Sequence, residues 1–259
     1  MSDRATGDYN IRAVERAVRV LVSFSDDHPE RTLPEIARAT ELPKSTAYRI
    51  LATLNNCGFV EQTRDGERYR LGMRVASLGL VALQRLSIRR DALPHMEQLV
   101  GRFEETCVVG IFDQGAVLDI EVVHSDHLLT VTSEVGHRLP IHCTATGKAL
   151  LAFLPHSVAE LVLARSLEAY TEKTITSPAD MRQEMALTRE RGYAVDEEEY
   201  EVGVRAVAAP ISDIHGRVIA GISIPGPTSR LTADRVPEIA QALMEVASAI
   251  RGKRRQGLC

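Results

Sequence analysis

Residues 43–62 read PKSTAYRILATLNNCGFVEQ, and this stretch decides the fold of the N-terminal part of the chain. Apolar residues recur at helical spacing between positions 44 and 56, which predicts a helix with one buried face. Pro43 suits the beginning of this helix because its missing N–H would have no partner there, and Gly58 favours an end shortly after it. The inner face would consist of Ala47, Ile50, Leu51 and Leu54.

Two further helices are predicted upstream of this one. Residues 11–25 carry the apolar spacing of an amphipathic helix. Thr32 and Glu35 form the pattern of a capping box, which predicts the start of a short helix that ends near Thr40. A short turn through Pro43 then leads into the third helix. Three helices with such a turn between the last two have the spacing of a helix-turn-helix.

A β-hairpin is predicted directly after the third helix. Residues 59–62 and 68–71 both alternate, and Asp65-Gly66 between them is a strong turn signal. A basic hairpin in this place makes the motif a winged helix, whose wing contacts the DNA backbone while the third helix reads the major groove. The residues expected to contact double-stranded DNA are Lys44, Ser45, Thr46, Tyr48 and Arg49 on the helix and Arg64, Arg68 and Arg70 on the hairpin.

The charge of the chain is unevenly distributed. The 259 residues carry a net charge of −4, which by itself disfavours nucleic acid as a partner. Residues 1–90 nevertheless have a net charge of +4 and the remainder −8. Residues 44–74 include six basic and three acidic residues. The local excess of positive charge lies where DNA contact is expected.

Several other classes of protein are not expected. No run of about 18 apolar residues predicts a membrane span, and the N-terminal residues MSDRATGDYN lack the apolar stretch of a secretory signal. The four cysteines are far apart, as in proteins of the reducing cytoplasm. The segment ATGKA lacks the first glycine and the final hydroxyl of a phosphate-binding loop. We expect a cytoplasmic protein with no catalytic residues, no cofactor and no metal; a metal at the histidine and cysteine cluster within 124–143 remains the alternative to scattered surface residues.

Residues 73–90 are predicted to form a linker helix. Its apolar stripe of Val75, Leu78, Ala82 and Leu86 is joined by leucines on other faces, so more than one face needs cover. A second copy of the chain would supply that cover, and a dimer would place two winged helices on a near-palindromic operator. We therefore expect a homodimer, with an ordinary intramolecular connector as the alternative.

Residues 91–259 read as a mixed α/β domain with a mainly antiparallel sheet, because hairpins outnumber crossover connections. The expected helices cover 91–105 (interrupted near its start by Pro94), 144–154, 157–165, 178–191 and 232–251. The expected strands cover 107–113, 116–124, 128–134, 204–212 and 217–225.

The string PKSTAYRILATLNNCGFVEQ, followed by YRLGMRVASLG at 69–79, resembles the winged helix of the IclR family of bacterial transcription regulators. RLPIHCTATGKALLA at 138–152, RGYAVDEEEYEVGVRAVAAPISD at 191–213 and VIAGISIPGPTSRLT at 218–232 resemble its C-terminal motifs. The resemblance implies an α+β protein with three parts: a winged helix-turn-helix over 10–72, a linker and dimerisation helix over 73–90, and a GAF-like effector-binding domain over 91–252. It also implies a dimer of dimers.

By motif position, the resemblance implies an effector pocket formed by Ala145, Thr146, Asp196, Ala206, Ser223 and Pro225. The helix start at 144–147 would offer backbone N–H groups to a carboxylate. Asp196 would either accept a hydroxyl hydrogen bond or be a buried structural acid. Ala206 and Pro225 carry no polar group where some relatives have a thiol and a hydroxyl. This difference favours a less polar or larger effector: an organic acid, above all an aromatic one, or a lactone.

The sequence thus predicts a DNA-binding transcription regulator, repressor or activator, whose operator affinity depends on a small-molecule effector. A DNA-binding protein without a ligand and an enzyme that uses the GAF-like pocket are the alternatives.

Overall fold

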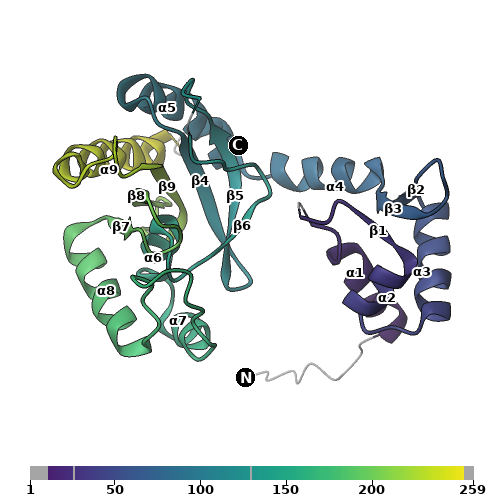
Figure 1. The fold of residues 1–259 in the computed structure, drawn as a ribbon. Coiled ribbons are helices and arrows are strands. Elements are labelled where there is room, and N and C mark those ends of the chain that lie inside the picture. The colour runs from purple at the N-terminus through teal and green to yellow at the C-terminus, as the bar shows by residue number, and fades with distance from the viewer. Residues whose placement is uncertain (1–10, 26, 129, 254–259) are drawn as a thin grey trace, which may run out of the picture. The chain divides into compact units, whose positions relative to one another are not determined.

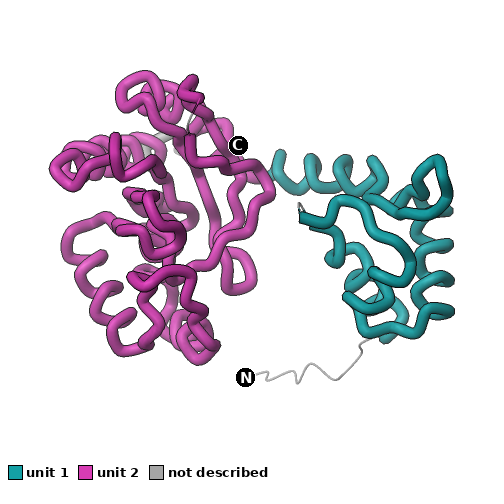
Figure 2. The backbone as a smooth tube through the Cα atoms, in the orientation of Figure 1, with its two compact units in different colours: residues 1–85 teal, residues 86–259 magenta. Residues whose placement is uncertain are grey.

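The computed structural model describes residues 11–25, 27–128 and 130–253. The chain divides into two compact units, residues 1–85 and residues 86–259 (Figure 2). No helix in the described part of the chain combines the length and the apolar composition of a membrane span.

The first unit is a winged helix-turn-helix with an additional helix at its end (Figure 1). β2 and β3 form the wing, and together with β1 they make a small antiparallel sheet in the order β1-β3-β2. Its elements are α1 (Arg12–Val22), β1 (Glu30–Thr32), α2 (Leu33–Ala39), α3 (Lys44–Asn56), β2 (Val60–Gln62), β3 (Arg68–Leu71) and α4 (Met73–Gln84).

Local signals and packing agree in this unit. The capping box at the start of α2 is confirmed, because Glu35 Oε2 accepts the Thr32 N–H at 2.7 Å and Thr32 Oγ1 accepts the Glu35 N–H at 3.4 Å. Ile36 and Leu51 are fully buried in a core shared by the three helices and the wing. Truncating either to alanine would cost about 2–5 kcal/mol of stability. The core therefore holds α3 in place with its other face outward.

The second unit contains a six-stranded antiparallel sheet in the order β6-β5-β4-β9-β8-β7. The strands are β4 (Cys107–Asp113), β5 (Ala116–Val123), β6 (Arg138–Pro140), β7 (Ala194–Glu197), β8 (Val204–Ser212) and β9 (Val218–Pro227). The helices are α5 (Ser87–Phe103), α6 (Ala145–Leu151), α7 (His156–Leu163), α8 (Pro178–Arg191), the 3₁₀ turn η1 (Ala233–Arg235) and α9 (Val236–Lys253).

Helices cover this sheet in two groups. α5 and α9 pack against each other and against the strands, whereas α6 contacts β7, β8 and β9 together with α8. The α6 contact consists of small residues, among them Ala149 and Ala208. Gly147 allows the closest approach, because a Cβ there would lie 2.2 Å from the backbone oxygen of Ile141. The beginning of α6 is thereby held tightly to the preceding turn.

Several expected elements differ from the structure. The predicted linker helix over 73–90 is not continuous: α4 ends at Gln84, and α5 begins at Ser87 after a non-helical Leu86 with ψ of 82°. The helix expected from 91 therefore begins four residues earlier and continues through Pro94, which only removes one backbone donor. No glycine or proline marks the break, so the sequence carries no local signal for it.

The strand predicted over 128–134 is wrong, since the described residues of this segment form no strand and β6 lies further on at Arg138–Pro140. β1 and β7 were not predicted at all. His142 and Cys143 lie in the turn before α6.

Candidate functional site

The outer face of α3 presents most of the predicted DNA-contacting residues to solvent. Lys44, Ser45 and Arg49 are exposed, and Tyr48 is 55% exposed although aromatic side chains are usually covered. Thr46 is half-buried at the edge of this face. The buried Ala47 and Leu51 lie on the opposite side of the helix. Hydroxyls, a lysine and an arginine are thus available at the N-terminal half of α3.

A groove of about 530 Å³ lies between α1 and α3. Thr46, Tyr48 and Arg49 border it from α3, and Arg16 borders it from α1. The sequence analysis did not select Arg16, because it is one of several charged residues on its helix. Its place beside Arg49 adds a second guanidinium at this edge of the unit.

The wing is a tight turn that presents Arg64. The Gly66 N–H donates to the Thr63 carbonyl at 2.8 Å, and Gly66 takes the positive φ of 74° that the turn requires. Arg64 is exposed at the turn. Arg70 lies further along β3 and forms an exposed ion pair with Glu61 at 3.2 Å, which contributes little to stability. Arg70 can therefore exchange this partner for a phosphate at small cost.

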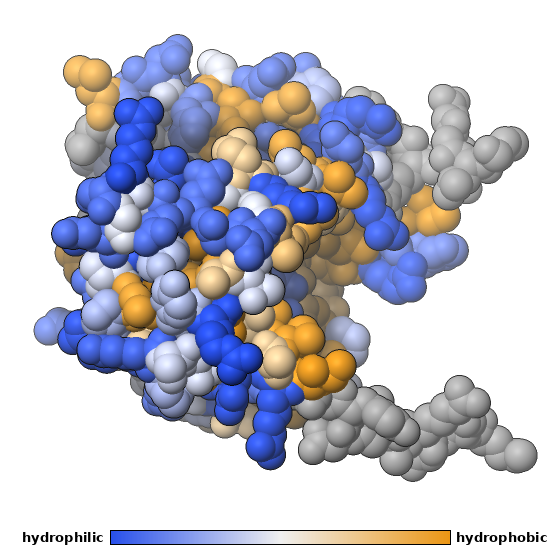
Figure 3. Space-filling view, turned by 90° about the vertical axis from the view of Figure 1, so that its right-hand side faces the viewer, coloured by the Kyte–Doolittle hydropathy of each residue, from blue (hydrophilic) through white to orange (hydrophobic). Residues whose placement is uncertain are grey.

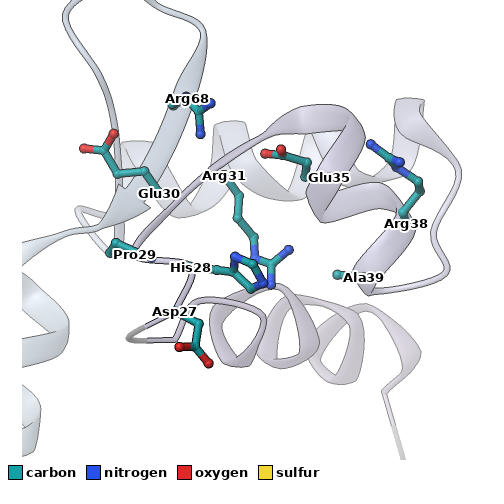
Figure 4. Close-up of a pocket in the computed structure, with 9 residues that line it drawn as sticks. All are labelled: Asp27, His28, Pro29, Glu30, Arg31, Glu35, Arg38, Ala39 and Arg68. Atoms are coloured by element: carbon teal, nitrogen blue, oxygen red, sulfur yellow. The ribbon is translucent and has the colours of Figure 1, made fainter.

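Arg68 differs from the other wing arginines. It lines an open hollow of about 820 Å³ beside α2, together with Arg31 and Arg38 (Figure 4). The same hollow contains Glu35, whose carboxylate accepts the Thr32 N–H that lowers its pKa. Arg31 Nε is buried and has no hydrogen-bond partner among the described residues. Asp27 and Glu30 line the hollow as well, so Arg68 lies among three acidic residues and two other arginines.

The second unit contains a cavity of about 180 Å³, formed separately from the DNA-binding face. Its lining draws on every strand of the sheet, on the turn before α6 and on the segment 131–133. The structure places all six residues of the predicted effector pocket around it: Ala145, Thr146, Asp196, Ala206, Ser223 and Pro225.

Two buried carboxyl groups border this cavity. Asp196 on β7 is 3% exposed, and burial raises its pKa to about 7 although its Oδ1 accepts the Glu199 N–H at 2.7 Å. Asp119 on β5 is 1% exposed, and burial raises its pKa to about 6. Asp196 is thus a buried acid with a backbone partner, and it borders the cavity.

The sequence analysis missed Asp119 and its neighbours Ser133 and His137, which also line the cavity. Asp119 occupies an inward position of an alternating strand, next to Ile120, the extra residue of a β-bulge. The sequence signal for Asp119 was a charged residue at a position where the alternation of the strand predicts a buried apolar one. His137 is the one basic side chain among the described lining residues, and no lysine or arginine belongs to them.

A buried ion pair lies behind one wall of this cavity. The Lys148 ammonium on α6 donates to the Glu199 carboxylate and lies 3.5 Å from Glu184. Lys148 is 2% exposed, so the pair is desolvated.

Cys143 shows no sign of a nucleophile, because burial raises its pKa to about 12. Within the described residues no group of three or more histidine, cysteine or acidic side chains is arranged to hold a metal.

The surface shown in Figure 3 is mostly hydrophilic, with separate hydrophobic patches. Exposed apolar residues include Val14 and Val18 on α1 and a group on α4.

A winged helix with an outward cationic helix, joined to a separate unit that encloses a small cavity, defines a DNA-binding regulator with a sensing domain. The chain belongs to the IclR family of bacterial transcription regulators: the IclR helix-turn-helix domain matches residues 13–64, and the C-terminal domain of the bacterial transcriptional regulator IclR matches residues 80–251. The family membership confirms the resemblance deduced from the sequence motifs.

Named relatives are regulators. The transcriptional repressor IclR of Escherichia coli (strain K12) is 34% identical over 249 residues, which cover 95% of this chain and 90% of that protein. The regulator KdgR of the same organism is 33% identical over 242 residues, covering 93% of this chain and 92% of that protein. Both relatives are named as regulators of transcription.

Solved structures agree in fold. An IclR homologue from Microbacterium hydrocarbonoxydans, complexed with 4-hydroxybenzoate, superposes with a TM-score of 0.82 at 31% identity and covers 95% of this chain and 100% of that one. The Thermotoga maritima IclR superposes with a TM-score of 0.71 at 31% identity, covering 94% and 99%. The chain is therefore an IclR-family DNA-binding regulator with a C-terminal effector-binding domain.

Proposed function

We propose that α3 and the wing bind an operator in double-stranded DNA. Ser45, Thr46, Tyr48 and Arg49 would meet base edges and nearby phosphates from the N-terminal half of α3, with Lys44 on the backbone. Arg64, Arg68 and Arg70 would hold the phosphates beside the wing. The exposure of α3 opposite its buried face is the observation that carries this proposal.

The domain assignment supports a protein that acts as a homodimer and assembles further into a dimer of dimers. Residues 10–72 would bind DNA, 73–90 would link and dimerise, and 91–252 would bind the effector. No residue of α4 is buried, and its Met73, Leu78, Leu80 and Val81 are between 54% and 74% exposed. A helix with so many exposed apolar side chains is expected to pack against a partner, and α4 of a second copy offers the same apolar surface.

The cavity in the second unit is the proposed effector site, and the proposed effector is an organic or aromatic acid. Its walls include Ala145, Ala206 and Pro225, which are apolar, and Ser223 and Thr146, which carry hydroxyls. The related structure solved in complex with 4-hydroxybenzoate supports a small aromatic molecule as the effector.

Regulation requires that the effector bind two arrangements of the protein unequally. Its binding would then change how well two recognition helices fit one operator, as a repressor or an activator. The protein would work in the cytoplasm, where the DNA is.

A gel-shift titration at a fixed salt concentration tests this function, because the affinity for DNA depends strongly on salt. The probe is DNA from upstream of the protein's own gene, and salt-matched random DNA is the control. We expect the upstream probe to bind at least about a thousandfold more tightly, and 4-hydroxybenzoate or a related acid to change that affinity in a saturable manner. Equal binding to both probes would contradict the operator proposal, whereas tight operator binding that no acid alters would favour the ligand-independent alternative.

A further inference from the structure

The carboxyl group of Asp119 is an unsatisfied acceptor inside the effector cavity. Asp119 is 1% exposed and lines the cavity from β5. Its Oδ2 accepts a hydrogen bond from Ser133 Oγ at 2.6 Å. Its Oδ1 is buried and has no hydrogen-bond partner within the described residues. A buried polar atom without a partner is costly, so this oxygen calls for a donor.

The surroundings fix this carboxyl group in position. The backbone N–H of Asp119 donates to the His137 carbonyl at 2.9 Å, and its own carbonyl accepts the Gly136 N–H at 2.8 Å. Gly110 faces it across the strand pair, and a Cβ there would lie 3.1 Å from Oδ1. None of the described residues donates a hydrogen bond to Oδ1. A molecule in the cavity can supply the missing donor.

The size and the walls of the cavity restrict that molecule. An engineered cavity of about 150 Å³ holds one benzene molecule, so about 180 Å³ suits a single ring with small substituents. Val108, Leu139 and Ala206 provide apolar surface for such a ring. A carboxylate offers no donor to Oδ1 and would repel it, whereas a hydroxyl group donates. At neutral pH Asp119 is mostly ionised despite its raised pKa, which makes the acceptor strong.

We propose that the effector is a single-ring molecule with a hydroxyl group, and that this hydroxyl donates a hydrogen bond to Oδ1 of Asp119. Asp119 is then the residue that selects hydroxylated rings over the same rings without a hydroxyl. The inference rests on the proposed effector site and specifies which group of the effector is recognised.

Two matched pairs of probes test this by calorimetric titration of the full chain at pH 8. The first pair is 4-hydroxybenzoate and benzoate, and the second is phenol and toluene. We expect the hydroxylated member of at least one pair to bind about tenfold more tightly or better, as for a hydrogen bond to a charged acceptor. Asp119→Leu keeps the branched shape without the acceptor, and it should abolish the preference.

Asp119→Asn keeps an acceptor oxygen and provides a second variant in case Asp119→Leu does not fold; it should reduce the preference several-fold without abolishing it. Glu134→Gln is the matched control, because it removes an exposed carboxylate next to Ser133 that does not line the cavity. It should leave the preference unchanged.

Two other outcomes are informative. Binding of these rings with no preference for the hydroxyl, or a preference that survives in Asp119→Leu, would overturn the inference and leave the effector site intact. Binding of none of the four molecules at millimolar concentration would overturn this inference together with the proposed single-ring effector.

Discussion

The backbone N–H of Glu199 donates a 2.7 Å hydrogen bond to Oδ1 of Asp196, and this bond joins the cavity of the second unit to the buried ion pair behind it. The carboxylate of the same Glu199 accepts from Lys148 on α6. Asp196 lines the cavity, while Lys148 and Glu199 line a second hollow on the other side of this connection. Two hydrogen bonds through Glu199 thus connect Asp196 to Lys148 on α6.

Removing one partner of the buried pair should strongly destabilise the second unit. For Glu199→Gln we expect the free energy of unfolding to fall by about 3 kcal/mol, because Lys148 would keep its buried charge with only Glu184 nearby. Urea unfolding followed by circular dichroism measures this. Glu238→Gln, which breaks an exposed pair with Arg102, is the control and should cost at most about 1 kcal/mol. Equal losses in both variants would mean that the buried pair contributes no more than a surface pair.

The stability should also decrease as the pH rises from about 4 to about 7. Burial raises the pKa of Asp119 to about 6 and that of Asp196 to about 7, so the folded state retains protons that the unfolded state has already released. Their contribution is complete below the ordinary aspartate pKa and is lost as the pH passes the folded-state values. At about 1.4 kcal/mol per pH unit, Asp119 accounts for at most about 3 kcal/mol.

Comparing the wild type with Asp119→Asn isolates the contribution of Asp119 to the pH dependence of stability, because the other titratable groups are present in both proteins. The titratable or charged groups that act on the two carboxyls are His137 for Asp119, and Lys148, Glu199 and Cys143 for Asp196. Unfolding curves at pH 4, 5, 6 and 7 should show a smaller decrease for the variant. Parallel pH profiles would show that Asp119 releases its proton at the same pH in both states.

Arg49 and Arg64 should differ in what they contribute to DNA binding. Arg49→Ala should cost about 1–3 kcal/mol mainly at particular bases, since Arg49 lies on the outer face of α3. Arg64→Ala should weaken all sequences about equally and reduce the slope of the salt dependence by about one. A gel-shift series with single-base operator variants separates the two patterns. Arg102→Ala, at an exposed arginine of the second unit, should leave operator binding unchanged. A uniform loss for Arg49→Ala would exclude base reading by this residue.

A charge on α4 should separate the protomers. Leu78 is 54% exposed on an apolar helix, and Leu78→Glu would place a carboxylate at the proposed contact between two copies. We expect a shift toward the mass of one chain in analytical ultracentrifugation, and a weaker affinity for a two-site operator. Gln84→Glu adds the same charge at an exposed position off the apolar stripe and should leave the mass unchanged. An unaltered dimer in Leu78→Glu would place the dimer contact elsewhere.

Elements with strong local signals were predictable from the sequence. The apolar period predicted α3 within its observed bounds, and the capping box located the start of α2. The segment 128–134 alternates like a strand, yet its side chains form hydrogen bonds with side chains from other parts of the chain. Thr130 shares a 2.9 Å hydrogen bond with Thr106, and Ser133 donates to Asp119. These contacts depend on tertiary structure, which periodicity does not encode.

Dependence on tertiary structure also explains why some residues that line the cavity could be predicted from the sequence and others could not. Asp196 and Ser223 belong to motifs that the sequence displays, so their positions could be proposed in advance. Asp119 belongs to none of these motifs, and its contacts with Ser133 and the His137 backbone arise from tertiary structure. The break at Leu86 likewise has no residue that enforces it.

The cavity touches all six strands of the sheet, from Leu139 on β6 to Asp196 on β7. A molecule bound there would contact every strand, so the strands could not separate without releasing it. Its binding energy would therefore protect the whole unit against heat and hydrogen exchange, rising with ligand concentration. Melting temperature alone could then rank a library of compounds before any operator is known.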